Sequence, residues 1–317
     1  MCIRDSYTPA NGILPLREAV SEDFLIRHNV NISPENIIIM PGGKPTMFFC
    51  ILMFGAHNKE IMYPNPGFPI YESLINYTGA KPVPIKLKEE LNFSFKADEV
   101  LERIYDLSSL IIINSPGIPT GGVIPRKEIE KLVKGLEAYP NVTILSDEIY
   151  SRLLYGKQKH TSFLEFPSIR SRLIVLNGWS KTYAMTGWRL GYSVWPNRLL
   201  EYANRLCVNN HSCVNTASQF AGLAALKGSQ NVVDEMLLEF DKRRNFIVNA
   251  LNKIPGISCK EPRGAFYVFP NIKNTGLSSQ KAQDNFLELS GVATIAGNSF
   301  GKMGEGFIRF SYANSLE

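Results

Sequence analysis

Long apolar runs are missing from this sequence of 317 residues. The longest near-continuous one, residues 47–56, is far shorter than the roughly 20 residues that a membrane-spanning helix needs. The first six residues have no apolar segment of the kind that a secretion signal contains. We therefore expect a protein without membrane partners.

Paired cysteines and clustered histidines are missing too. The five cysteines are an odd number and form no C-x-x-C pair, which is typical of reduced thiols and predicts a cytoplasmic protein. The four histidines have neither the H-E-x-x-H spacing nor a Cys/His ligand spacing, so no metal site is predicted.

A strong charge of one sign is also absent, because the net charge is only +5 and the basic residues are scattered. Their densest group, residues 242–244, lies in a helical pattern that favours a solvated face, so we expect no nucleic-acid partner. With 44% hydrophobic and 20% charged residues, the composition is that of a globular protein of about two domains.

What the sequence does contain is a regular alternation of short β-rich runs and amphipathic helices. Residues 110–113, 127–138 and 142–145 form a clear strand–helix–strand unit. Further strands are predicted at 37–40, 61–63, 81–87, 173–176 and 190–195, and further helices at 14–28, 45–54 and 70–77. Such alternation predicts an α/β fold with a mostly parallel sheet sandwiched by helices.

The pattern changes after Gly228. A long helix at 232–252 leads into antiparallel-looking strands at 265–269 and 307–312, with a helix near 280–289 between them. We place the domain boundary near Glu235, which gives a large domain at 1–234 and a smaller α+β C-terminal domain at 235–317. We expect a chain truncated at both ends. At the C-terminus, Ser315 is a good helix N-cap followed by only two residues, so the small domain is expected to be incomplete.

Four motifs place unusual polar residues after strands or within them: N-S-P-G-I-P-T-G at 114–121, S-D-E-I-Y at 146–150, G-W-S-K-T-Y-A-M-T-G-W-R at 178–189 and F-I-R-F-S-Y at 307–312. In open α/β sheets, ligands bind at the carboxyl ends of the strands. Taken singly, Asp147 could be a helix cap, Lys181 a surface lysine and Arg309 half of a structural ion pair. Their joint order favours a functional site.

Together with G-A-F-Y at 264–267, these motifs resemble those of class I and II aminotransferases, which are fold-type I enzymes dependent on pyridoxal 5'-phosphate, and those of aspartate aminotransferases in particular. The resemblance runs from Y-T-P-A-N-G at 7–12 to residue 313. It implies a large cofactor domain, a small domain built from both chain ends, and a homodimer with composite active sites. Because the resemblance begins close to residue 1, we expect the chain to be without the family's N-terminal arm.

The resemblance assigns four residues to the cofactor ring. Lys181 matches the lysine that forms the Schiff base and later carries the proton, and a lowered pKa would suit both tasks. Asp147 matches the partner of the pyridine nitrogen, and Tyr150 matches the phenol that hydrogen-bonds the 3′ oxygen. Phe68 matches the aromatic side chain that stacks on the ring.

The resemblance assigns further residues to the cofactor phosphate. Gly43 and Lys44 lie at a predicted helix N-terminus, where free N–H groups favour an anion. Arg189 matches the family's phosphate arginine, and Tyr7 matches a tyrosine that reaches the phosphate of the neighbouring subunit. Gly178 stands where many relatives have serine, so one phosphate hydroxyl is expected to be missing.

The substrate would be held by two cations. Arg309 matches the arginine that grips the α-carboxylate bidentately. Lys44 resembles a lysine that holds the distal carboxylate of acidic substrates, which favours aspartate and glutamate with 2-oxoglutarate. The alternative is a solvent-facing Lys44 and a preference for aromatic or other neutral amino acids. Ile118 departs from the family, whose asparagine there touches the 3′ oxygen and supports the carboxylate arginine.

Three other functions stay open at this point. One is a lyase or synthase of the same fold that eliminates at Cβ or Cγ. Another is a non-enzymatic sensor domain of a transcription regulator, although those proteins have a basic winged-helix domain before this fold, which we do not expect in this protein. The last is an inactive, truncated fragment.

Overall fold

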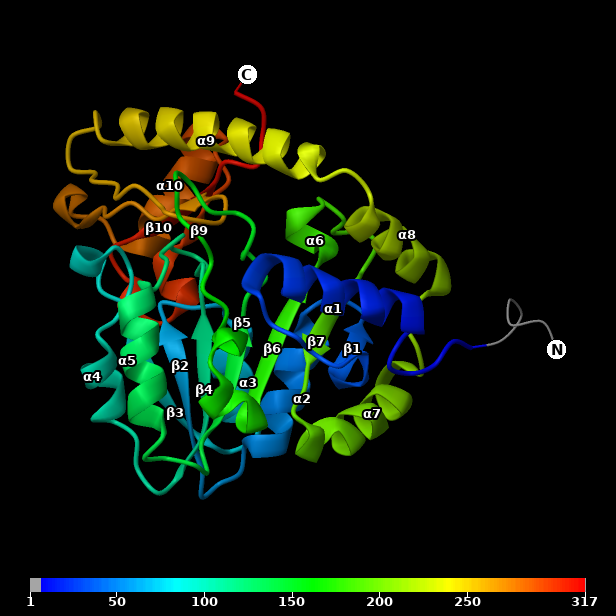
Figure 1. Ribbon diagram of the computed structural model, residues 1–317. Helices are drawn as coiled ribbons and strands as arrows, with labels where there is room; N and C mark the ends of the chain where they lie inside the picture. Colours follow the sequence, from blue (N-terminus) through cyan, green and yellow to red (C-terminus); the bar gives the residue numbers. More distant parts are fainter. Residues whose placement is uncertain (1–6, 317) are drawn as a thin grey trace.

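The computed structural model describes residues 7–316 and is built around a seven-stranded sheet (Figure 1). Its strands follow the order β1-β7-β6-β5-β4-β2-β3. They are β1 (Ile37–Met40), β2 (Glu60–Asn65), β3 (Lys81–Lys86), β4 (Ser108–Asn114), β5 (Thr143–Asp147), β6 (Leu173–Gly178) and β7 (Gly191–Val194). Strands β3, β2, β4, β5 and β6 are parallel, whereas β7 is antiparallel to both of its neighbours, β6 and β1. The predicted mostly parallel sheet is confirmed.

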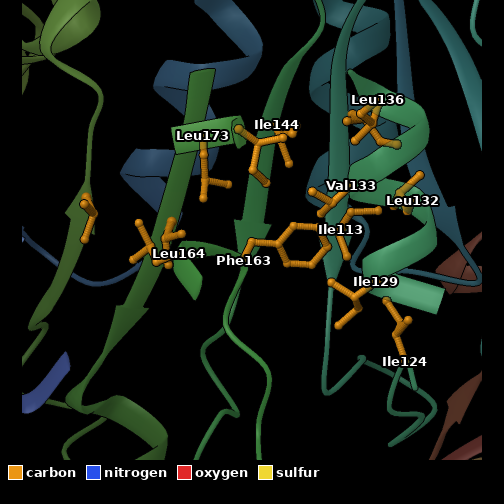
Figure 2. Close-up of a cluster of buried hydrophobic side chains, with 14 of the residues drawn as sticks. Ile113, Ile124, Ile129, Leu132, Val133, Leu136, Ile144, Phe163, Leu164 and Leu173 are labelled. Carbon is orange, nitrogen blue, oxygen red and sulfur yellow. The ribbon is translucent and has the colours of Figure 1, made fainter. Parts of the chain in front are cut away.

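Helices cover both faces of this sheet, so nearly every strand residue outside the edge strand β3 is buried. Alternate side chains along each strand enter two separate cores. One core packs α1 (Leu14–His28), α4 (Ala97–Leu101) and α5 (Arg126–Leu136) against Ile111, Ile113 and Ile144. Figure 2 shows α5 directing its apolar side chains, including Ile129 and Val133, toward the strands.

The second core lies on the opposite face of the same strands. It packs α2 (Lys44–Phe54), α3 (Ile70–Tyr77) and α7 (Asn197–His211) against Ile112 and Leu145. Within β4, Ile111 and Ile113 face one core and Ile112 faces the other, as the period-2 geometry of a strand requires.

The C-terminal elements form a smaller α+β unit at the end of the sheet toward which the parallel strands point (Figure 1). Its antiparallel sheet has the order β8-β10-β9. The elements are α9 (Asn231–Leu251), β8 (Tyr267–Val268), α10 (Ser279–Ser290), β9 (Ile295–Ala296) and β10 (Ile308–Ser311). The expected domain boundary near Glu235 falls inside the continuous α9 and stays a prediction.

Most predicted elements lie within a few residues of the observed ones, and 14–28 and 70–77 coincide with α1 and α3. Sequence patterns predict neither α7 nor α8 (Thr216–Lys227). Helix α7 contains four asparagines, which are weak helix formers, and α8 is rich in small residues without a clear apolar face. Among the described residues, no helix is both long and apolar enough to cross a membrane.

Candidate active site

A cavity of about 550 Å³ opens at the carboxyl ends of the central strands, between the large sheet and the C-terminal unit. It brings together every predicted site residue except Tyr7. These residues are Gly43, Lys44, Phe68, Asp147, Tyr150, Lys181, Arg189 and Arg309. They come from segments as far apart in the sequence as α2 and β10, so only the fold assembles them.

Asp147 ends β5 and lies at the floor of the cavity, only 1% exposed. Its Oδ2 accepts a hydrogen bond of 2.5 Å from the Tyr71 hydroxyl, and its Oδ1 accepts one of 3.2 Å from the Ile149 backbone N–H. Burial raises the pKa of Asp147 to about 6 despite these two donors. Within the described residues no cation pairs with this carboxylate, so a cationic ring nitrogen would complete its environment.

Lys181 lies in α6 (Trp179–Thr182), a short helical turn that follows β6 directly. Its Nζ lies 5.4 Å from the centre of the Phe266 ring. Burial lowers the pKa of Lys181, and the nearby positive charges of Arg189 and Arg309 lower it further. The amine therefore spends more time neutral than an ordinary lysine, as a nucleophile and base must.

The turn before α2 could hold an anion. Gly43 is the N-cap of α2 and Lys44 is its first residue, so backbone N–H groups at this helix N-terminus have no intrahelical partner. Arg189 lines the same part of the cavity and donates from Nη1 to the Thr186 carbonyl oxygen at 2.8 Å. Arg189 adopts a left-handed backbone conformation with φ of +50°, an uncommon state for a non-glycine residue that is frequent at functional sites.

Three glycines pack backbone against backbone beside this turn. A Cβ at Gly178 would lie 2.8 Å from the Gly191 Cα, and a Cβ at Gly191 would lie 2.7 Å from the Gly42 carbonyl carbon. Both distances are shorter than any real side chain tolerates. A serine at position 178 would therefore require the backbone of β7 to move.

Phe68 and Lys44 both line the cavity, and Nζ of Lys44 lies over the Phe68 ring, 5.5 Å from its centre. Phe68 also packs edge-to-face on Tyr71, with ring centres 6.1 Å apart. Lys44 makes no ion pair with any described residue. Its charge is thus available to an anionic ligand.

Arg309, in β10, lines the same cavity. Its guanidinium contacts two aromatic rings, 4.8 Å from the centre of Tyr267 and 5.1 Å from that of Phe300. Its buried Nε has no hydrogen-bond partner, and no carboxylate among the described residues pairs with this arginine. A buried guanidinium N–H without an acceptor is costly unless a ligand supplies one.

Tyr150 is almost fully buried, and its hydroxyl lies 3.0 Å from that of Tyr267. Burial raises the pKa of Tyr150 well above its ordinary value. Ile118 lines the cavity beside these two tyrosines, and its backbone N–H donates to Asn114 Oδ1 at 2.9 Å. The apolar side chain of Ile118 thus lines the cavity at the position where the resemblance implies an asparagine in the family.

Tyr7 lies apart from the cavity and is 83% exposed. Its assignment to the phosphate of a neighbouring subunit stays a prediction.

Comparison with known proteins agrees with this geometry. The family model described as "Aminotransferase class I and II" matches residues 3–317. The chain belongs to the class I and II aminotransferase family.

Individual members of this family match almost the whole chain. An aspartate aminotransferase of Pyrococcus horikoshii is 40% identical over 98% of this chain and 79% of its own length. An aromatic-amino-acid aminotransferase of Thermococcus litoralis is 36% identical over 98% of this chain and 80% of its own. The crystal structure of an aromatic aminotransferase from Pyrococcus horikoshii has a TM-score of 0.93 at 34% identity and covers 98% of this chain and 83% of its own. The resemblance in the motifs and the predicted fold class are both confirmed.

Sequence reasoning missed two residues of the site, Tyr71 and Tyr267. Tyr71 lies three residues after Phe68, so the two side chains share one face of the chain as it enters α3, and this spacing could have revealed it. Tyr267 ends the G-A-F-Y motif, which was noted in the sequence without a role.

Proposed function

We propose that this aminotransferase-family protein binds pyridoxal 5'-phosphate and exchanges amino and oxo groups between an amino acid and a 2-oxo acid. One observation supports this proposal above the others. Lys181 with a lowered pKa, the buried Asp147 without a cation, and the unpaired Arg309 all line a single cavity.

The residues present fit the cofactor. Its phosphate matches the α2 N-terminus and Arg189, its ring nitrogen matches the unpaired carboxylate of Asp147, and its 3′ oxygen matches the Tyr150 hydroxyl. When bound, pyridoxal phosphate supplies an electron sink for the negative charge that develops at the substrate Cα.

The protein's own residues would then do the remaining work. Arg309 holds the α-carboxylate through two parallel N–H donors and so fixes which bond at Cα stands over the ring. The neutral Nζ of Lys181 would take the proton from the substrate Cα and deliver it to C4′ of the cofactor, two atoms away. The negative charge of the Asp147 carboxylate would keep a proton on the ring nitrogen, because it stabilises the positively charged form of that nitrogen. Phe68 covers one side of the cavity and excludes water there.

We propose aspartate and glutamate, with 2-oxoglutarate as acceptor, as the preferred substrates. A second carboxylate needs a second cation, and Lys44 lines the cavity without an acidic partner among the described residues. One relative is an aspartate aminotransferase, in agreement with this preference.

The alternative is an aromatic or other neutral amino acid. Three apolar side chains, Met47, Phe68 and Ile118, line the same cavity, and another relative is an aromatic-amino-acid aminotransferase. Rates with aspartate and with phenylalanine, compared at equal concentration, separate the two substrate classes.

We also propose a cytoplasmic homodimer with composite active sites. Its support is the membership in a family of this kind together with the scattered, unpaired cysteines. Sedimentation of the purified protein tests the dimer.

The decisive experiment adds pyridoxal phosphate to the purified chain and records its absorbance before and after each of aspartate, glutamate, alanine and phenylalanine. A transaminase converts the cofactor to its amine form and releases a 2-oxo acid, whereas a lyase releases ammonia. Lys181→Ala should abolish the borohydride-reducible attachment of the cofactor, and the exposed Lys227→Ala serves as the matched control. Attachment at the wild-type level in Lys181→Ala would refute the assignment of the lysine.

A further inference from the structure

The two buried tyrosines of the cavity form one polar unit. The hydroxyls of Tyr150 and Tyr267 lie 3.0 Å apart, and either oxygen can donate to the other. If the Tyr150 proton points to a ligand oxygen in the cavity, the Tyr267 proton must be the one shared between them. A hydroxyl that accepts a hydrogen bond is a stronger donor, because consecutive hydrogen bonds polarise one another.

The ring of the same Tyr267 supports Arg309. Tyr267 pairs with Ser311 across β8 and β10, so its side chain and that of Arg309, two residues away, stand on the same face of the small sheet. The guanidinium lies 4.8 Å from the centre of the Tyr267 ring. This cation–π contact fixes the plane of the guanidinium and leaves its N–H edge free for a carboxylate.

The contacts of Tyr267 with Tyr150 and Arg309 matter because the neighbouring Ile118 is apolar. Ile118 packs against the cluster that contains Tyr150 and Tyr267, and its side chain can neither donate to a cofactor oxygen nor hydrogen-bond Arg309. Tyr267 contacts Tyr150 through its hydroxyl and Arg309 through its ring.

We propose that Tyr267 is a positioning residue that performs both tasks left undone by Ile118: its hydroxyl strengthens Tyr150 as a donor, and its ring orients Arg309 toward the substrate carboxylate. This inference rests on the proposed function and concerns the same site.

The first test separates the hydroxyl from the ring. In Tyr267→Phe the ring remains, so the pKa read from the absorbance of the bound cofactor should rise by about half a unit, with little change in KM. The matched control is Tyr312→Phe, which removes a hydroxyl from the other buried tyrosine pair, Tyr155–Tyr312, outside the cavity. An unchanged pKa in Tyr267→Phe, or an equal rise in both variants, overturns the role of the hydroxyl.

The second test removes the ring. In Tyr267→Leu the Kd of succinate, an unreactive dicarboxylate, measured by calorimetry on the loaded protein, should rise about three- to thirtyfold. In Tyr267→Phe it should change less than about twofold, since the aromatic face is kept. Equal affinities in Tyr267→Leu and wild type overturn the role of the ring, and Tyr267→Phe keeps the proposal testable if Tyr267→Leu does not fold.

The third test asks whether Tyr267 replaces an asparagine. In the Ile118→Asn background, Tyr267→Phe should raise the cofactor pKa by less than half as much as it does in the wild type, because the new amide supplies a second donor. Equal rises in both backgrounds contradict the compensation. If wild-type protein neither binds pyridoxal phosphate nor transaminates, the proposed function fails; if it does both and the Tyr267 variants match it, only this inference fails.

Discussion

Tyr71 donates a hydrogen bond of 2.5 Å to Oδ2 of Asp147 at the floor of the cavity. Burial raises the pKa of both groups, and the negative charge of Asp147 raises that of Tyr71 further. Tyr71 therefore stays protonated and acts only as a donor, which stabilises the charged form of the carboxylate. Burial still dominates at Asp147, whose pKa is raised to about 6.

This relationship predicts an acid-dependent stability of the cofactor-free protein. The pKa of Asp147 is about 6 in the folded state, above its ordinary value of 3.8. The folded state thus binds the proton more tightly, and the resulting stability is present at low pH and lost as the pH rises through 6. Between pH 4.5 and 7.5 this loss amounts to about 2 kcal/mol in the free energy of unfolding.

In Asp147→Asn that loss should disappear, as measured by urea unfolding at both pH values. Other titrating groups affect both proteins equally and cancel in the comparison. Tyr71→Phe should enlarge the loss, because the carboxylate then lacks its hydroxyl donor. The same pH dependence in wild type and Asp147→Asn would show that the carboxyl is not perturbed.

Arg309→Lys should raise KM for every amino-acid substrate, whatever its side chain. Lysine keeps the charge but loses the planar pair of donors, and one charged hydrogen bond is worth about 1.5–3 kcal/mol, or roughly ten- to a hundredfold. The matched control is Arg243→Lys on α9, where the arginine pairs with Glu239 outside the cavity. An unchanged KM in Arg309→Lys would move the carboxylate site elsewhere.

Lys44→Ala tests the substrate class by steady-state kinetics. If Nζ holds a distal carboxylate, kcat/KM for aspartate should fall by about tenfold or more, and that for alanine or phenylalanine much less. Equal losses for all three substrates would instead indicate a role toward the phosphate or in folding.

Ile118→Asn should raise kcat/KM by roughly ten- to a hundredfold, because asparagine can donate directly to the 3′ oxygen, on which Tyr267 acts only through Tyr150. The backbone of the turn is already held by the bond from Ile118 N–H to Asn114 Oδ1. A pH titration of the cofactor absorbance should show a lower pKa than in wild type. If the cavity has repacked around isoleucine for another substrate, activity or stability would fall instead, because the new amide would be buried without a partner.

The sequence predicted the strands, and the edge of the sheet at which the cavity opens, because both depend on local patterns. Residues 110–113 are apolar throughout, as a strand buried on both faces must be, and Asp147 ends the next strand along the chain. Contacts between distant segments had no such signal. Tyr71 and Asp147 are 76 residues apart, and Tyr150 and Tyr267 are 117 apart, so their hydrogen bonds could be found only in the folded chain.

The backbone contacts among Gly42, Gly178 and Gly191 have a consequence for how this protein could be re-engineered. They join the turn before α2 to the turn that contains Lys181, so the spacing between these two turns is set by the main chain rather than by exchangeable side chains. Lys44 and Ile118 border the cavity without taking part in these contacts. Changes of substrate range at those two positions can therefore be made while Lys181 and the turn before α2 keep their separation.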